Sequence, residues 1–139
     1  MTEFPIIIPG ECIPQGSHSV NRKTGHLFDA NSRLKAWRKE AAVHLDQYIG
    51  TWFGAWEPYD GPLHVDVEFM FARPKSVPAS KRAHPSVKPD LDKLQRALGD
   101  MLTISGIIAD DARITRWTAA KRYRNSARTV IHLIEEDRP

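Results

Sequence analysis

Residues 88–114 read KPDLDKLQRALGDMLTISGIIADDARI, and this stretch decides the fold. Apolar residues recur in this stretch at intervals of three and four. This spacing predicts a helix over residues 91–104 that packs one face on a core. Pro89 disfavours helical geometry in the residue before it, and Asp90 is a favoured N-cap type. We therefore expect the helix to begin at Asp90. The apolar positions are Leu91, Leu94, Leu98 and Met101 or Leu102.

Strands are predicted on both sides of this helix. Residues 63–71 alternate apolar with largely polar side chains, which is typical of a strand with one buried face. Two further strands are predicted after the helix, at 113–123 and 129–135. We expect a turn at Asn125 and Ser126 to join them.

The order of the predicted elements is typical of one small α+β domain. The N-terminal part is expected to contain a strand at 4–9, a loop at 10–32 and an amphipathic helix at 33–48. Residues 73–89 contain four prolines and several basic residues without periodicity, so we expect a mobile basic loop there. We predict a single domain over residues 1–139, with a mixed sheet of about four strands and two helices.

The composition favours a globular protein of the cytoplasm. Hydrophobic residues make up 41% of the chain and charged residues 27%, which is typical of globular domains. The single cysteine, Cys12, excludes an internal disulfide and a cysteine-rich zinc site. No apolar run reaches the roughly 18 residues of a membrane helix, so no membrane partner is expected.

Basic residues flank the aspartates along the sequence. The net charge of +3 is mild for a nucleic-acid-binding protein, but residues 73–88 and 113–128 hold several Lys and Arg and no acidic residue. Such stretches can neutralise DNA phosphates, and binding should then weaken with added salt. The candidate DNA contacts are Lys81, Arg82, Lys88, Arg116, Lys121 and Arg122.

Four aspartates are expected to meet at the start of the predicted helix. Asp90 and Asp92 border that helix end, and the helix rises by roughly 21 Å at 1.5 Å per residue. Gly106 can end the helix, and an extended segment after it would return roughly 20 Å. If that segment runs antiparallel to the helix, Asp110 and Asp111 arrive beside Asp90 and Asp92.

Clustered carboxylates predict a site for a hard divalent cation, Mg²⁺ with Mn²⁺ as a possible substitute. Such an ion binds a phosphodiester and activates water for attack on phosphorus. Arg96 lies four residues after Asp92 and can reach the phosphate, although a helix-surface ion pair explains it equally well. Taken singly, the aspartates are also explained as capping and turn residues. No phosphate-binding loop is present, so no nucleotide cofactor is expected.

The aspartate pattern resembles the signature of the RusA family of Holliday junction resolvases, which are common in phages and prophages. The pattern is Asp90-Leu91-Asp92 at the start of a helix, followed later by Asp110-Asp111. The resemblance implies a homodimer with two active sites, each binding magnesium, that nicks symmetric strands of a four-way junction. The expected location is the cytoplasm of a bacterial or phage-infected cell.

The resemblance also implies roles for individual residues. It makes Asp90, Asp92 and Asp111 catalytic metal ligands, with Asp110 as a further candidate ligand. Arg96 stands where the family often has a lysine, so the positive charge is kept but the compact ammonium is not.

The N-terminal segment adds to the resemblance. The sequence IPQGS at residues 13–17, followed by a basic helix with Trp37, is similar to phage members of the family. Gln15 and Ser17 can hydrogen-bond DNA phosphates from this segment, and a plain turn explains it equally well.

Two other functions fit the same sequence. One is a less selective nuclease for flaps and other branched DNA, because the chemistry is the same and branch selection depends on dimer geometry. The other is a non-catalytic DNA-binding protein in which the aspartates are caps and turns, and it predicts no metal-dependent cleavage.

Overall fold

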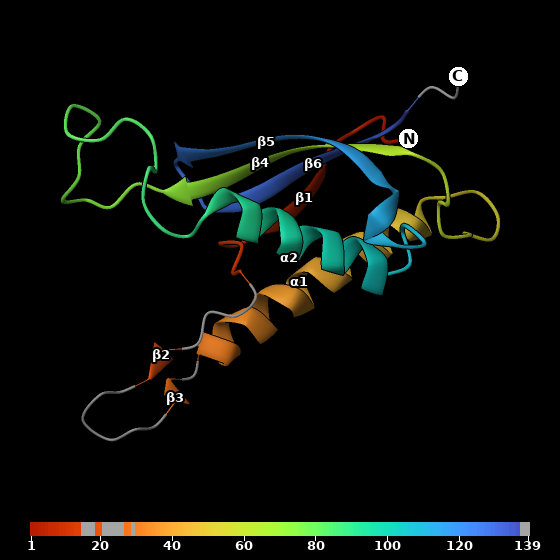
Figure 1. The fold of residues 1–139 in the computed structure, drawn as a ribbon, viewed down its shortest axis with the longest axis horizontal. Helices are drawn as coiled ribbons and strands as arrows, with labels where there is room; N and C mark the ends of the chain where they lie inside the picture. The colour runs from red at the N-terminus through yellow and green to blue at the C-terminus, as the bar shows by residue number, and fades with distance from the viewer. Residues whose placement is uncertain (15–18, 21–26, 29, 137–139) are drawn as a thin grey trace.

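The computed structural model describes residues 1–14, 19–20, 27–28 and 30–136. These residues form a small α+β domain in which two long helices accompany a four-stranded mixed sheet (Figure 1). The predicted fold class is therefore confirmed. In chain order the elements are β1 (Ile6–Pro9), β2 (Ser19–Val20), β3 (Leu27–Phe28), α1 (Ala30–Gly50), β4 (Leu63–Ala72), α2 (Leu91–Ile104), the 3-10 turn η1 (Asp111–Arg113), β5 (Ile114–Arg124) and β6 (Arg128–Glu135).

The sheet has the strand order β1-β6-β4-β5. β4 pairs in parallel with β5 and antiparallel with β6, and β1 pairs antiparallel with β6. β5 and β6 are consecutive in sequence but lie on opposite sides of β4. The predicted turn at Asn125 and Ser126 therefore passes the end of β4 and does not close a hairpin. This placement gives β4, the strand with the clearest apolar alternation, two neighbours.

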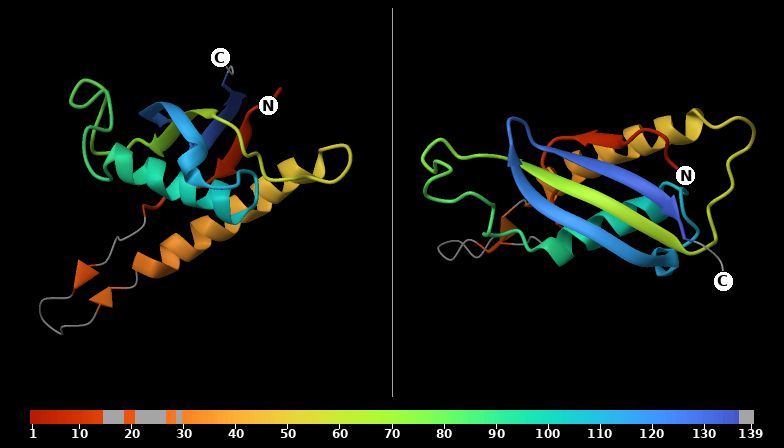
Figure 2. Two further views of the ribbon diagram at one scale, coloured as in Figure 1. Left: turned by 45° about the vertical axis from the view of Figure 1, so that its right-hand side comes forward. Right: turned by 90° about the horizontal axis from the view of Figure 1, so that it is seen from above.

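Both helices lie on the same face of the sheet (Figure 2). The alternation of β4 places Leu63, Val65, Val67 and Phe69 in the core, where they are buried together with the apolar face of α2. Burial of each such side chain stabilises the fold by about 1.5–3 kcal/mol. This packing fixes α2 against the sheet, and it positions the residues at the start of α2.

Most element bounds agree with the sequence prediction. α2 spans the predicted residues 91–104, and α1 begins at Ala30 and ends at Gly50, slightly beyond the predicted 33–48. The short pair β2–β3 falls where a loop was predicted, because strands of two residues are too short to show a pattern. None of the helices in the described part of the chain has the length and apolar composition needed to span a bilayer.

Residues 73–89 contain no helix or strand, as predicted. Arg73 donates hydrogen bonds to the carbonyls of Val77, Arg82 and Ala83, and Pro85 is buried. The segment is therefore held by its own polar contacts. Its mobility stays a prediction.

Candidate active site between α2 and β5

A pocket of about 240 Å³ lies between α2 and β5. Asp111, at the start of η1, lies beside Gly99 near the middle of α2, and Lys121 of β5 contacts the backbone just before α2. β5 therefore runs along α2 in the opposite direction. The pocket is lined by Asp92, Gln95, Arg96, Gly99, Asp111, Ile114 and Trp117.

Gly99 allows η1 and β5 to approach α2 closely. A Cβ atom at Gly99 would lie 3.6 Å from Cβ of Asp111, 3.8 Å from Cδ1 of Ile114 and 3.9 Å from Cζ2 of Trp117. A methyl group at this position would therefore be in ordinary van der Waals contact with all three residues. The sequence analysis did not single out Gly99 or Trp117. A lone glycine inside a helical pattern was the available signal for Gly99.

The return segment after α2 is shorter than predicted. Gly106 has φ +80° and reverses the chain, and the backbone N–H groups of Ile107 and Ile108 both donate to the carbonyl of Leu102. These two isoleucines are fully buried, so the segment packs on the end of α2 and does not run extended along it. Asp111 therefore reaches the level of Gly99, about 12 Å along the helix from its first residue. The predicted extended course of the return segment was wrong for this reason. Of the four aspartates expected to meet, Asp92 and Asp111 line one pocket, and Asp90 and Asp110 lie outside its lining.

Residues before β4 hold the return segment in place. Tyr59 donates its backbone N–H to the carbonyl of Ile107 and accepts from the N–H of Ala109, both at 2.9 Å. Trp56 Nε1 donates to the carbonyl of Gly106 at 2.8 Å. The sequence analysis missed these contacts because they join residues about 50 positions apart, which no local pattern reveals.

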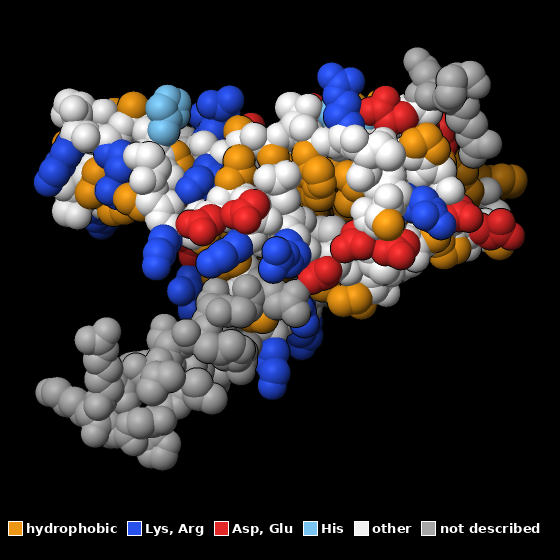
Figure 3. Space-filling view, viewed as in Figure 1, with side chains coloured by type: hydrophobic (Ala, Val, Ile, Leu, Met, Phe, Trp, Pro, Cys, Tyr) orange, Lys and Arg blue, Asp and Glu red, His pale blue; other side chains and the backbone are white. Residues whose placement is uncertain are grey.

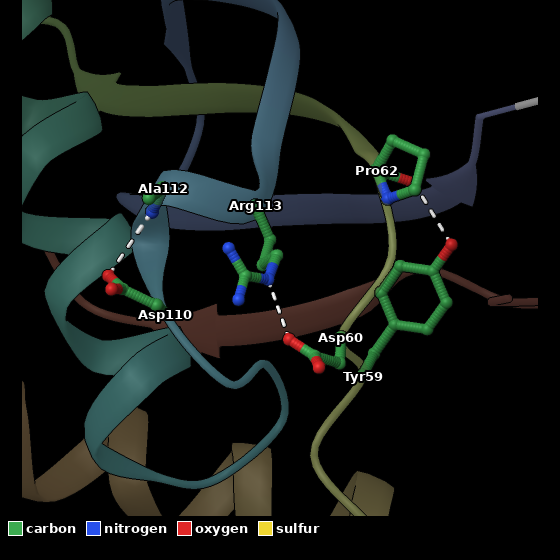
Figure 4. Close-up of polar contacts among 6 residues, drawn as sticks. All are labelled: Tyr59, Asp60, Pro62, Asp110, Ala112 and Arg113. Atoms are coloured by element: carbon green, nitrogen blue, oxygen red, sulfur yellow. Dashed lines mark hydrogen bonds and ion pairs between the residues drawn. The ribbon is translucent and has the colours of Figure 1, made fainter.

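Asp110 and Asp111 differ in their surroundings. The Asp110 carboxylate accepts a hydrogen bond from the backbone N–H of Ala112 at 3.2 Å, so it has the predicted turn-forming contact (Figure 4). This bond lowers the pKa of Asp110, and the Asp111 side chain lowers it further. The pKa of Asp111 is raised by its hydrogen bond with Asp110, by desolvation, and by the negative charges of Asp110 and Asp100. A positive charge placed beside Asp111 would lower this pKa again.

Asp90 and Asp92 lie at the start of α2. Asp90 is the N-cap residue, but its side chain makes no capping hydrogen bond, and Oδ2 lies 3.8 Å from Nζ of Lys93. Capping therefore does not account for the Asp90 carboxylate. Asp92 is exposed and lines the pocket, whereas Asp90 and Asp110 are not part of its lining.

The donors at the pocket suit a hard cation. Asp92 and Asp111 offer carboxylate oxygens in one pocket, and Mg²⁺ is commonly bound by one or two carboxylates with water and phosphate completing its shell. Among the described residues, no group of three Asp, Glu, His or Cys side chains lies close enough to form an all-protein metal site. The donor set fits an ion that keeps several waters.

Arg96 lines the same pocket and is exposed to solvent. No hydrogen bond or ion pair joins its guanidinium to another described residue, so the alternative explanation of Arg96, a helix-surface ion pair, is not seen in this part of the chain. Figure 3 shows acidic and basic side chains side by side on the face over α2. The pocket therefore has an anionic side, from Asp92 and Asp111, and a cationic side, from Arg96.

The six candidate DNA contacts fall into two groups. Lys81, Lys88 and Arg116 are exposed, and their side chains have no hydrogen-bond or ion-pair partner among the described residues. The side chains of the other three have partners. Arg82 Nε donates to Tyr123 Oη at 3.0 Å, and Lys121 Nζ donates to backbone carbonyls. Arg122 Nε lies 3.4 Å from a carboxylate oxygen of Glu68. Gln15 and Ser17 lie outside the described residues.

A protein-family model for the endodeoxyribonuclease RusA matches residues 9–134. The chain belongs to the RusA endodeoxyribonuclease family. The match includes the whole pocket between α2 and β5 and confirms the resemblance seen in the aspartate pattern. A comparison with curated proteins found no matching relative. RusA family members are metal-dependent nucleases that act on branched DNA. Membership of this family is therefore evidence against the hypothesis of a non-catalytic DNA-binding protein.

Proposed function

We propose that this RusA family enzyme is a magnesium-dependent nuclease that resolves four-way DNA junctions by symmetric paired nicks. The observation that carries the proposal is that Asp92, Arg96 and Asp111, from two separate elements, line one pocket. Two carboxylates can hold a divalent cation and an arginine can bind a phosphate, which are the charges that metal-assisted phosphodiester hydrolysis uses.

In this proposal Asp92 and Asp111 hold the metal ion, and Asp90 at the N-cap, outside the pocket lining, is a further candidate ligand. Asp110 is a further candidate ligand that also forms the turn carrying Asp111. When bound, Mg²⁺ polarises the phosphate and lowers the pKa of a water molecule. Arg96 donates to phosphate oxygens and offsets the charge that develops during cleavage. Mn²⁺ is expected to replace Mg²⁺ because its oxygen-ligand preference is similar.

The DNA contacts in this proposal begin with Lys81, Lys88 and Arg116, whose charges have no partner among the described residues. Arg82 and Arg122 add positive potential near them, whereas the Lys121 ammonium binds backbone carbonyls, and Gln15 and Ser17 remain candidate contacts. Each phosphate contact steepens the dependence of log K on log salt by about 0.9. Paired nicks require two sites, so we propose that the enzyme is a homodimer.

The test is cleavage of a labelled four-way junction and a matched linear duplex, with Mg²⁺ or with a chelator. We expect paired nicks in the junction only, and only with Mg²⁺. Asp111→Asn is expected to reduce the rate at least about 100-fold, because losing a ligand costs several kcal/mol of transition-state stabilisation. Asp110→Asn is the matched control. It should reduce the rate less, because the Asp110 carboxylate already bonds to Ala112.

Other outcomes assign other functions. Equal cleavage of a flap substrate and the junction would indicate the less selective branched-DNA nuclease. Equal rates for Asp111→Asn and the wild type would exclude the proposed site. Sedimentation of the free protein as a monomer at assay concentration would contradict the homodimer.

A further inference from the structure

Lys121 lies on the face of β5 that is turned toward the helices. Its partner in the parallel register is Phe69 of β4, which is buried in the core. Trp117, four residues earlier on the same strand, lines the pocket beside α2. The Lys121 side chain therefore extends along the sheet surface toward the first residues of α2, and not outward to solvent.

The Lys121 ammonium binds the backbone immediately before α2. Nζ donates to the carbonyl of Val87 at 2.8 Å and to the carbonyl of Pro89 at 2.8 Å. An ammonium has three N–H donors, so two of the three are used inside the protein. Asp90 directly follows Pro89, and Asp92 lies in the first turn of the helix. The charge of Lys121 thus fixes the chain one residue before the first candidate ligand.

Two arginines hold the preceding part of the segment to the same strand. The guanidinium of Arg73 lies 4.4 Å from the ring centroid of Tyr123, and Arg82 donates to Tyr123 Oη. Tyr123 is two residues after Lys121 and lies on the same face of β5, because alternate residues of a strand share a face. The end of β5 therefore holds residues 73–89 at several points, of which Lys121 is the one nearest α2.

We propose that Lys121 is a positioning residue for the metal-binding carboxylates of α2. Its two hydrogen bonds hold the backbone of Val87 and Pro89 against β5, and this sets where Asp90 and Asp92 lie relative to Asp111, which is carried by η1 directly before β5. Lys121 thus acts through the backbone and not by contact with the substrate. This inference rests on the proposed function of the pocket.

A positioning role for Lys121 and a DNA-contact role predict different results. The DNA-contact role is the one that the basic stretch of sequence suggested by itself. A lysine that neutralises a phosphate contributes about 0.9 to the salt slope of binding. A lysine that positions metal ligands leaves junction binding without metal unchanged and raises the Mg²⁺ concentration needed for activity. Loss of supporting contacts around metal ligands typically weakens metal affinity 10–100-fold.

The test compares Lys121→Met with the wild type in two assays. The first measures junction affinity against salt in chelator, and the second measures junction cleavage against Mg²⁺ concentration. We expect an unchanged salt slope and a half-saturating Mg²⁺ concentration raised roughly tenfold or more. Lys121→Arg, which keeps charged donors, should restore most of the wild-type Mg²⁺ requirement. Lys75→Met is the control, because Lys75 is an exposed lysine of the same segment with no partner among the described residues.

Each outcome decides the matter. A salt slope reduced by about one with an unchanged Mg²⁺ requirement would make Lys121 a DNA contact and overturn the inference. If the wild type itself fails to cleave the junction, the proposed function fails and not this inference alone. If Lys121→Met melts below the assay temperature, Lys121→Gln takes its place. Its side chain is one bond shorter and uncharged, so it is expected to lose at least one of the two hydrogen bonds. A raised Mg²⁺ requirement then supports positioning, and a wild-type value contradicts it.

Discussion

Nε of Arg113 donates to Oδ1 of Asp60 at 2.6 Å, and this contact joins the turn that carries Asp111 to the segment before β4 (Figure 4). The two residues are 53 positions apart in sequence. Both side chains are exposed, with 42% and 69% of their surface accessible, so the pair contributes little to stability. Its structural effect is on the location of η1, because Arg113 is the last residue of that turn.

Asp60→Asn should therefore reduce junction cleavage more than it reduces stability. The amide keeps the shape but loses the charge that holds Arg113, so the turn with Asp111 is less well fixed. We expect a several-fold fall in rate and a change in the free energy of unfolding below about 1 kcal/mol. Rates and urea unfolding measured on the same samples provide the check. Glu11→Gln is the control, because Glu11 forms an exposed 2.6 Å pair with Arg33. Equal effects of the two substitutions on the rate would refute the prediction.

Arg96→Lys and Arg96→Met separate the charge of Arg96 from its shape. Arg96 lines the pocket with Asp92 and Asp111, so we expect Arg96→Met to lose roughly 100-fold or more in rate. Arg96→Lys should keep cleavage within about tenfold, since an ammonium supplies the charge without the bidentate geometry. Single-turnover cleavage of the junction is the measurement. Activity of Arg96→Met close to wild type would remove Arg96 from the reaction.

Gly99→Ala should fold well and cleave poorly. A methyl group at Gly99 meets Asp111, Ile114 and Trp117 at ordinary contact distances, and alanine is favoured over glycine in a helix by about 0.5–1 kcal/mol. The protein should therefore gain up to about 1 kcal/mol in unfolding free energy, while the methyl group narrows the pocket and lowers the rate. Gly50→Ala, where nothing lies within 4 Å of the new Cβ, should leave the rate unchanged. Full activity of Gly99→Ala would show that the substrate does not contact the part of the pocket that Gly99 lines.

Cys12 should make the protein less stable at alkaline pH. Its thiol is buried, and desolvation, followed by the charge of Glu11, raises its pKa well above the ordinary 9.0. The folded state therefore keeps a proton that the unfolded chain loses, so the stabilisation is fully present below pH 9.0 and falls as the pH rises further. The loss should approach about 1.4 kcal/mol per pH unit.

Urea unfolding of the wild type and Cys12→Ala between about pH 7.5 and 10 measures this effect. The wild type should lose more stability than Cys12→Ala over that range. Tyr48, whose pKa is also raised by burial, affects both proteins alike and cancels in the comparison. Parallel curves for the two proteins would contradict the prediction.

Patterns within single elements predicted the fold well. The apolar stripe of α2 and the alternation of β4 gave the correct elements, because each reflects burial of one face of a regular structure. The strand order was not predictable, since the pairing of β4 with both β5 and β6 depends on contacts between distant residues. The contacts of Asp60 with Arg113 and of Lys121 with Pro89 could not be predicted for the same reason.

The sequence by itself determined the two helices, the four strands of the main sheet and the candidate aspartates, because spacing and residue type act locally. Only the tertiary structure decided how these aspartates are grouped. Buried Ile107 and Ile108 shorten the return segment, so Asp111 stops beside Gly99 and shares a pocket with Asp92 and not with Asp90. Burial of apolar side chains outweighs the extended path that the segment could have taken, and packing of this kind depends on the whole core.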